Sequence, residues 1–184
     1  MTYTEISANV LTVLCIVLAG QNSKLNWPVG IIASAIFGIL FYNSKLYADS
    51  ILQIFFIGTS LYGWARWVVD TELKSLSVDE LMLYLVIGIA GAAVYGLILH
   101  KYTDAYAPFV DSAALAFSIV AQFLLMNRYK ETWLFWILVN SISVPLFYSR
   151  GLYLTSGLYL AFLFHAIYAM RKWNLNFKNQ EITL

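Results

Sequence analysis

Seven long apolar runs, separated by short polar breaks, occupy most of this chain of 184 residues. They lie at 5–21, 28–43, 49–69, 80–100, 111–127, 132–149 and 153–173. A helix needs about 20 mostly apolar residues to cross a bilayer, and the runs approach or reach that length. They are continuous and lack the in–out alternation of strands in an outer-membrane barrel. The sequence therefore predicts an all-α protein with seven transmembrane helices.

The composition agrees with this prediction. Hydrophobic residues make up 61% of the chain and charged residues 11%, whereas a soluble domain carries about 25% charged residues. The net charge of +1 provides no basic surface for nucleic acid. The single cysteine, Cys15, excludes an internal disulfide. A soluble enzyme, a disulfide scaffold and a nucleic-acid-binding protein are thus excluded, and the expected environment is a lipid bilayer.

Basic residues are distributed unevenly over the predicted loops. With the N-terminus outside, the inner loops and the tail contain Lys24, Arg66, Lys74, Arg128, Lys130, Arg171, Lys172 and Lys178. The outer loops contain Lys45, Lys101 and Arg150. Because cytoplasmic loops are enriched in Lys and Arg, this distribution predicts an outside N-terminus and an inside C-terminus.

The chain also carries an internal repeat. Shifted by 106 residues, 6–67 falls on 112–173 without a gap, and 16 of the 62 pairs are identical. The composition alone would give about four or five identical pairs, and self-similarity at a fixed offset indicates duplication. The identical pairs include Trp27 with Trp133, Trp67 with Trp173, Tyr42 with Tyr148 and Tyr62 with Tyr168. We interpret the two segments as copies of one three-helix unit.

The repeat predicts the topology. The fourth helix lies between the copies, so four crossings separate equivalent helices and both copies have the same orientation. This is a parallel 3+1+3 repeat of the SWEET type, in which the substrate site lies near the midplane between the repeats. We expect a first three-helix bundle at 1–69, a linker with the fourth helix at 70–107, a second bundle at 108–173 and a cytoplasmic tail at 174–184.

The sixth helix offers the sharpest set of candidate ligand-binding residues. Trp133, Trp136 and Asn140 are spaced by three and four residues, which places them on one helix face. Indole faces stack on flat rings and attract cationic rings, and a carboxamide both donates and accepts hydrogen bonds. An interfacial aromatic belt is the alternative for the tryptophans, above all for Trp133.

Polar side chains inside other helices are weaker candidates. Gln53, Ser60 and Trp64 share a face of the third helix. His165 in the seventh helix either contacts a ligand or ties helices together, and the same alternative holds for Gln53. A hydrogen bond from the Ser60 hydroxyl to its own helix backbone is the structural alternative there.

Several motifs of catalysis are absent. The sequence contains no G-x-x-x-x-G-K-[ST] phosphate loop, no H-E-x-x-H motif, no Cys/His cluster and no G-x-S-x-G motif. We therefore expect a protein that is not an enzyme, without a metal site or a cofactor.

Taken together, the segments resemble the PnuC family of bacterial vitamin transporters. The resemblance rests on Asn26-Trp27-Pro28-Val29-Gly30, Leu46-Tyr47-Ala48-Asp49, Gln53, Tyr62-Gly63-Trp64, Pro108-Phe109-Val110-Asp111-Ser112, Glu131-Thr132-Trp133-Leu134-Phe135-Trp136 with Asn140, and Gly151-Leu152-Tyr153. It implies facilitated diffusion of a phosphate-free vitamin precursor, above all nicotinamide riboside, across the bacterial inner membrane. It also implies that Trp133, Trp136 and Asn140 contact the heterocycle, with Gln53 near the sugar.

The resemblance further implies a cytosolic vitamin kinase that traps the arriving substrate by phosphorylation. Ser60 and Ala169 depart from residues that are frequent in the family. Thiamine, whose thiazolium ring is also a cation, is therefore the main alternative substrate, followed by riboflavin and nucleosides. A sugar facilitator of the SWEET type and a non-transport scaffold are alternatives of other classes. The oligomeric state, including a homo-oligomer, stays open.

Overall fold

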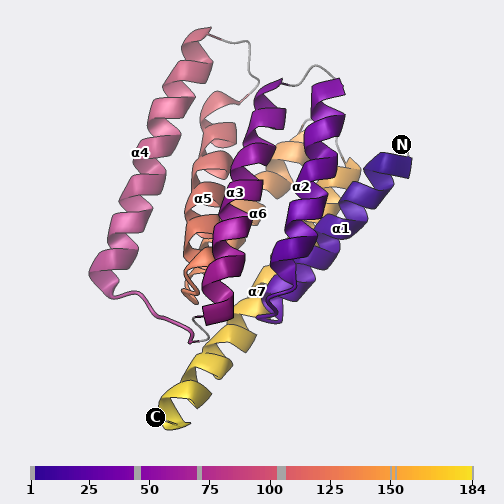
Figure 1. Cartoon of the computed structure of the whole chain (residues 1–184). Coiled ribbons are helices and arrows are strands. Elements are labelled where there is room, and N and C mark those ends of the chain that lie inside the picture. The colour runs from indigo at the N-terminus through magenta and orange to yellow at the C-terminus, as the bar shows by residue number, and fades with distance from the viewer. Residues whose placement is uncertain are drawn as a thin grey trace. The chain divides into compact units, whose positions relative to one another are not determined.

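The described residues form seven helices and no strand. The computed structural model describes residues 3–43, 47–69, 72–102, 107–149, 151 and 153–183. The helices are α1 (Tyr3–Gly20), α2 (Asn26–Asn43), α3 (Tyr47–Val69), α4 (Val78–Tyr102), α5 (Pro108–Met126), α6 (Thr132–Ser149) and α7 (Tyr153–Thr183). Figure 1 labels them and colours them from the N-terminus to the C-terminus. The predicted all-α class and each of the seven predicted helices are confirmed, with ends that differ by a few residues except in α7.

Three of these helices are long and apolar enough by themselves to cross a membrane, namely α4, α5 and α6. Within α1 and α2, the shorter apolar stretches are Ile6–Gly20 and Asn26–Leu40. This count concerns only the part of the chain that the structure describes.

The chain divides into two compact units, residues 1–72 and 73–184. In the first unit, α2 packs against both α1 and α3. In the second, α4 packs on α5, α5 on α6, and α6 on α7. The fourth helix, expected in a linker, therefore lies along α5 as part of the second unit.

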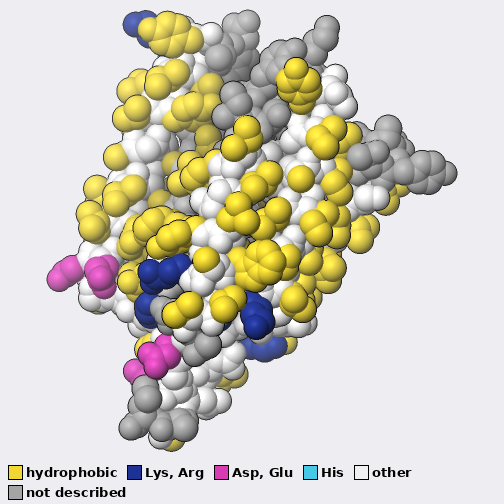
Figure 2. All heavy atoms as spheres, viewed as in Figure 1, with side chains coloured by type: hydrophobic (Ala, Val, Ile, Leu, Met, Phe, Trp, Pro, Cys, Tyr) yellow, Lys and Arg dark blue, Asp and Glu magenta, His cyan; other side chains and the backbone are white. Residues whose placement is uncertain are grey.

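Glycines allow α4 to approach α5 closely. A Cβ added at Gly88 would overlap the ring of Phe117, and one at Gly96 would lie 2.5 Å from a ring carbon of Phe109. The rest of α4 is mostly exposed and apolar, as Figure 2 shows along its length. Asp79 and Glu80 lie in its first turn and Lys101 in its last, so the charges of α4 lie at its two ends.

A capping box explains where α4 begins. The Ser77 Oγ accepts from the Glu80 N–H at 3.3 Å, and the Glu80 Oε2 accepts from the Ser77 N–H at 2.8 Å. The pair satisfies two backbone donors that the helix itself leaves free.

The two copies of the repeat use the same turn between their first two helices. Asn22 (φ 56°) and Arg128 (φ 61°) lie 106 residues apart and both adopt the left-handed conformation. The backbone hydrogen bonds also correspond: Ser23 N–H donates to the Leu18 carbonyl and Tyr129 N–H to the Leu124 carbonyl, each at 3.0 Å. The duplication predicted from the sequence is therefore confirmed in backbone geometry.

A side-chain hydrogen bond spanning 11 residues links the same two helices in each unit. In the first unit, the Cys15 Sγ donates to the Asn26 carbonyl at 3.2 Å. In the second, the Thr132 Oγ1 donates to the Ala121 carbonyl at 2.7 Å. In the repeat, Cys15 corresponds to Ala121 and Asn26 to Thr132. The same two positions are therefore linked in both units, but the donor side chain lies on the first helix in one unit and on the second helix in the other.

The last helix is longer than expected. Residues 174–183, expected in a tail, continue α7, and Figure 1 shows α7 extending past the ends of α5 and α6. The Gln180 side chain pairs with the backbone of Leu73: its Oε1 accepts from the N–H at 2.9 Å and its Nε2 donates to the carbonyl at 3.3 Å. The ammonium of Lys130 lies 4.2 Å from the ring centre of Phe177.

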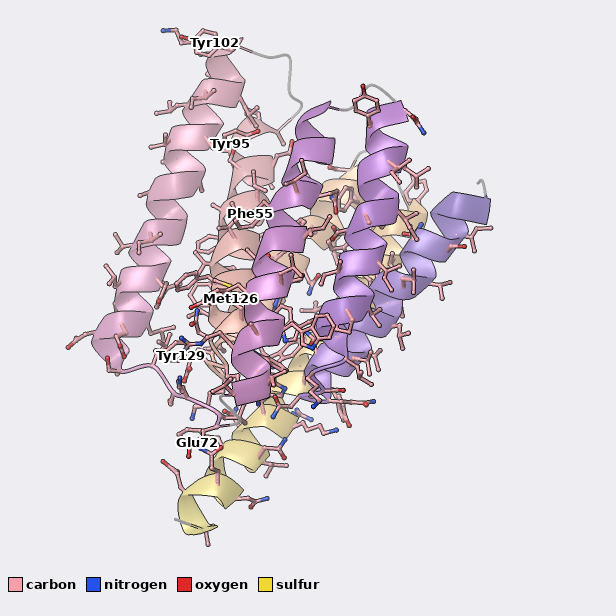
Figure 3. The ribbon with its side chains drawn as sticks, in the orientation of Figure 1. Phe55, Glu72, Tyr95, Tyr102, Met126 and Tyr129 are labelled. Carbon is pink, nitrogen blue, oxygen red and sulfur yellow. The ribbon has the colours of Figure 1, made fainter. Side chains whose placement is uncertain are left out.

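The segment before α4 is also fixed to the turn between α5 and α6. Lys74 forms an isolated parallel bridge with Tyr129, which Figure 3 labels in this turn. The carboxylate of Glu131 accepts from the Ser75 hydroxyl at 2.8 Å and from the Leu76 N–H at 3.0 Å. Residues 73–77 are thus held by two parts of the second unit before α4 begins.

Candidate functional site

The structure places the three candidate residues of α6 in different surroundings. Trp133 is 2% exposed and Asn140 is 5% exposed, while Trp136 is half-buried. Helical spacing puts them on adjacent parts of one helix surface. Their side chains nevertheless contact different residues of the second unit.

Trp133 packs against α7. Its ring centre lies 5.7 Å from that of Trp173 and 6.1 Å from that of His165, and both pairs meet at an interplanar angle of 77°. These edge-to-face arrangements are favourable for aromatic rings. The Trp133 Nε1 is buried and forms no hydrogen bond. In the first unit the Nε1 of Trp27 is in the same state, so this feature belongs to the repeat as well as to the candidate site.

Trp136 packs in another direction. It contacts a buried cluster of α5 and α6 that consists of Phe117, Val120, Ala121, Leu124, Phe135 and Val139. The side chain is partly buried by this packing and partly accessible. Trp136 therefore combines a fixed position with a free surface, as a stacking residue requires.

Asn140 has a constrained amide. Its Nδ2 donates to the Trp136 carbonyl at 2.8 Å, one turn earlier in α6. Because a carbonyl can only accept, this bond fixes which end of the amide is nitrogen. The second N–H and the Oδ1 then remain for another partner, which can accept from one and donate to the other.

His165 lies beside Trp133 and also near Tyr168, whose ring centre is 6.2 Å away. The side chain is half-buried on α7. Of the expected site residues, Trp133 and His165 are thus brought into direct contact. The contact is consistent with a role in tying α6 to α7.

The other three candidates lie on α3 of the first unit. Gln53 is half-buried, and its Cβ would lie 3.5 Å from a Cβ built on Gly38 of α2. Ser60 is 5% exposed and faces Gly30 of α2, whereas Trp64 is 40% exposed. Figure 3 labels Phe55 on the same helix, a further exposed aromatic residue. These side chains therefore differ in burial although they share a helix.

The repeat shows which candidates are particular to the second unit. Trp133 has a tryptophan counterpart, but Trp136 corresponds to Gly30 and Asn140 to Ser34. The first three-helix unit thus packs without a second indole or a carboxamide at these positions.

Sequence reasoning passed over several buried polar residues. Thr132 and Ser156 each hydrogen-bond a carbonyl of a neighbouring helix, and Glu131 fixes the segment before α4. Their signal was weak, since hydroxyl residues are common in membrane helices. Among the described residues, no group of three or more His, Cys, Asp and Glu is placed to hold a metal ion.

Comparison with known proteins identifies the family. The family described as nicotinamide mononucleotide transporter matches residues 2–175. The nicotinamide riboside transporter PnuC of Escherichia coli K12 is 27% identical over 94% of this chain and 85% of its own. The PnuC transporter of Neisseria mucosa is 30% identical over 76% of this chain and 57% of its own.

A solved structure agrees with the sequence matches. The crystal structure described as the vitamin B3 transporter PnuC is 26% identical and covers 96% of this chain and 83% of its own, with a TM-score of 0.76. The members of this family are transporters rather than enzymes, and the apolar helices are those of a multi-pass membrane protein. The chain therefore belongs to the nicotinamide mononucleotide transporter family, and its resemblance to PnuC proteins is confirmed.

Proposed function

We propose that this chain carries nicotinamide riboside across the bacterial cytoplasmic membrane by facilitated diffusion. The observation that carries the proposal is the pairing of a supported, half-buried Trp136 with the oriented amide of Asn140, one turn apart on α6. The similarity to two nicotinamide riboside transporters supports the choice of ligand.

The chemistry of the ligand fits these two residues. The nicotinamide ring of the riboside is a flat cation, and an indole face attracts such a ring by about 0.5–2 kcal/mol. Its carboxamide can accept from the free N–H of Asn140 and donate to the Oδ1, which gives two hydrogen bonds in one plane. Trp133 forms the neighbouring wall.

The distribution of positive charge favours the riboside over the mononucleotide. No Lys or Arg lies between Lys24 and Lys45, between Lys101 and Arg128, or between Arg150 and Arg171. A phosphate moved to the midplane would lack the cationic partner that a buried anion needs. The phosphate-free precursor avoids this cost.

The same distribution supports an outside N-terminus and an inside C-terminus. The C-terminal part of α7 carries Lys172 and Lys178 and belongs on the cytoplasmic side. Of the three cations assigned to outer loops, Lys45 and Arg150 lie outside the described residues.

A cytosolic kinase that phosphorylates the arriving riboside would make net uptake one-way.

The remaining candidates take secondary roles in this proposal. Gln53, Ser60 and Trp64, which share a face of α3, are the further candidates for contact with the ligand. His165 holds the ring of Trp133 through their edge-to-face contact. Thiamine is the second candidate substrate. Its thiazolium cation can stack on an indole, and its aminopyrimidine ring can hydrogen-bond to the amide of Asn140.

Competitive uptake tests the choice of substrate. Proteoliposomes that contain this protein and enclose a nicotinamide riboside kinase with ATP should accumulate labelled nicotinamide riboside, and unlabelled thiamine should not compete. Entry of labelled thiamine, in vesicles with a thiamine kinase, without entry of the riboside would refute the first choice. Vesicles without kinase should equilibrate the riboside without accumulating it.

Replacement of Trp136 tests the site. Trp136→Ala should weaken binding by at least ~1 kcal/mol, or about fivefold in Kd, since a stacking partner is lost. Leu134→Ala is the matched control, because Leu134 is 43% exposed on the same helix. An unchanged Kd in Trp136→Ala, measured by calorimetry, would assign Trp136 to packing alone.

A further inference from the structure

Two aromatic residues of α7 contact the indole of Trp133. His165, Ala169 and Trp173 follow one another at intervals of four residues, so they lie on one face of the helix. We call these three residues the α7 shelf. His165 and Trp173 meet the Trp133 ring edge-to-face, and Ala169 between them is 0% exposed.

The first unit contains the corresponding tryptophan pair. Trp27 and Trp67 lie 5.2 Å apart between ring centres, at an interplanar angle of 89°. All four tryptophans of the two pairs are at most 2% exposed. An edge-to-face tryptophan pair between the second and third helices is therefore part of the packing of the repeat itself.

Two differences distinguish the second pair. His165 corresponds to Thr59, whose hydroxyl donates to the Phe56 carbonyl of its own helix at 3.1 Å. Trp133 thus has an aromatic neighbour that Trp27 lacks.

The other difference is at the middle of the shelf. Ala169 corresponds to Gly63, where an added Cβ would lie 2.6 Å from the Cη2 of Trp27. Ala169 has a Cβ, so Trp133 cannot approach α7 as closely as Trp27 approaches α3 at Gly63. The indole of Trp133 therefore has to lie farther from α7.

From this geometry we infer that the α7 shelf positions Trp133 for the ligand, with Trp173 as a positioning residue that never touches the substrate. This inference rests on the proposed site on α6. Ala169 spaces the indole away from α7, and His165 and Trp173 hold its edge contacts two turns apart. Trp133 is thereby held in place one turn from Trp136.

The repeat supplies a matched control for the test. Trp173→Phe and Trp67→Phe each shorten one member of an equivalent buried pair, so they should lower thermal stability to a similar degree. Only the first should affect the ligand. We expect Trp173→Phe to raise the Kd for nicotinamide riboside about fivefold, as loss of an edge contact of about 1 kcal/mol would. Trp67→Phe should change the Kd by less than about twofold.

A second variant tests the spacing directly. Ala169→Gly gives the shelf the residue of the first unit and should raise the Kd, because the indole can then settle towards α7; the lower helix propensity of Gly should also lower the Tm by a few degrees. A Kd that changes equally in Trp173→Phe and Trp67→Phe, or that stays unchanged in Ala169→Gly, would overturn the inference. Failure of the wild-type protein to bind nicotinamide riboside would instead overturn the proposed function.

Discussion

Gly63 provides the most direct test of the packing in the first unit. A Cβ placed there would lie 2.6, 2.7 and 2.8 Å from three benzo carbons of Trp27, whereas ordinary contact begins at 3.4 Å. The indole is rigid and 2% exposed, and Trp67 confines it on another side. Gly63→Ala therefore overpacks a site that has little room to give.

The magnitude follows from a comparison with Gly58 on the same helix. An added Cβ at Gly58 meets nothing within 4 Å. Both substitutions gain the same helix propensity, about 1 kcal/mol in favour of Ala, so this term cancels in their difference. Overpacking of a tight core costs about 1–3 kcal/mol. We therefore expect Gly63→Ala to be about 1–3 kcal/mol less stable than Gly58→Ala.

Thermal unfolding in detergent measures this difference. For a chain of this size each kcal/mol corresponds to about 2–4 °C in Tm, which is easily resolved. If Gly63→Ala melts at or above Gly58→Ala, the close approach of Trp27 to α3 is wrong. Trp27→Phe in the Gly63→Ala background should recover part of the loss, and this coupling would assign the cost to the Trp27 ring.

Two further predictions concern the second unit. Thr132→Ala should lower the free energy of unfolding by about 1–3 kcal/mol, because it removes the buried hydrogen bond to the Ala121 carbonyl, while Thr132→Ser should retain most of it. Gln180→Ala should speed hydrogen exchange at the Leu73 amide by about fivefold, as loss of about 1 kcal/mol implies, whereas exposed Asn174→Ala should not. Unchanged stability in the first case, or unchanged exchange in the second, would contradict the hydrogen bonds described.

The fold was largely predictable because hydropathy and the repeat are properties of whole segments. Continuous apolar runs specify helices, and the 106-residue offset identified the duplication that Asn22 and Arg128 confirm in backbone geometry. The association of α4 with α5 was not predictable in the same way. It depends on the fit of Gly88 and Gly96 against two phenylalanine rings, and hydropathy contains no information on such a fit.

The extension of α7 shows another limit of sequence reasoning. Polar residues after Trp173 end the hydrophobic run, so a tail was expected there. The helix continues because Phe177 and Gln180 find partners in segments far away in the sequence, at Lys130 and Leu73. Such tertiary contacts decide the state of a polar segment whose local pattern is compatible with either helix or coil.

For the candidate site, the sequence supplied residue types and helix faces but not directions. Spacing placed Trp133, Trp136 and Asn140 on one side of α6, yet Trp133 turns to α7 and Trp136 to the cluster beneath it. The hydrogen bond from the Asn140 amide to its own helix was equally unpredictable. Each depends on which neighbour fills the space around a side chain.

The repeat also separates packing from ligand contact among these residues. Trp133 has a counterpart, Trp27, that is equally buried and equally paired with a tryptophan, so packing is sufficient to explain its presence. Trp136 and Asn140 correspond to Gly30 and Ser34, so the same three-helix unit forms without them. Losses at Trp136 and Asn140 should consequently raise the Kd, with the Tm lowered only by the packing that each side chain makes within the second unit, whereas a loss at Trp133 should both raise the Kd and lower the Tm. A single ligand without symmetry has to be recognised by the positions at which the two copies differ, and these two are such positions on α6.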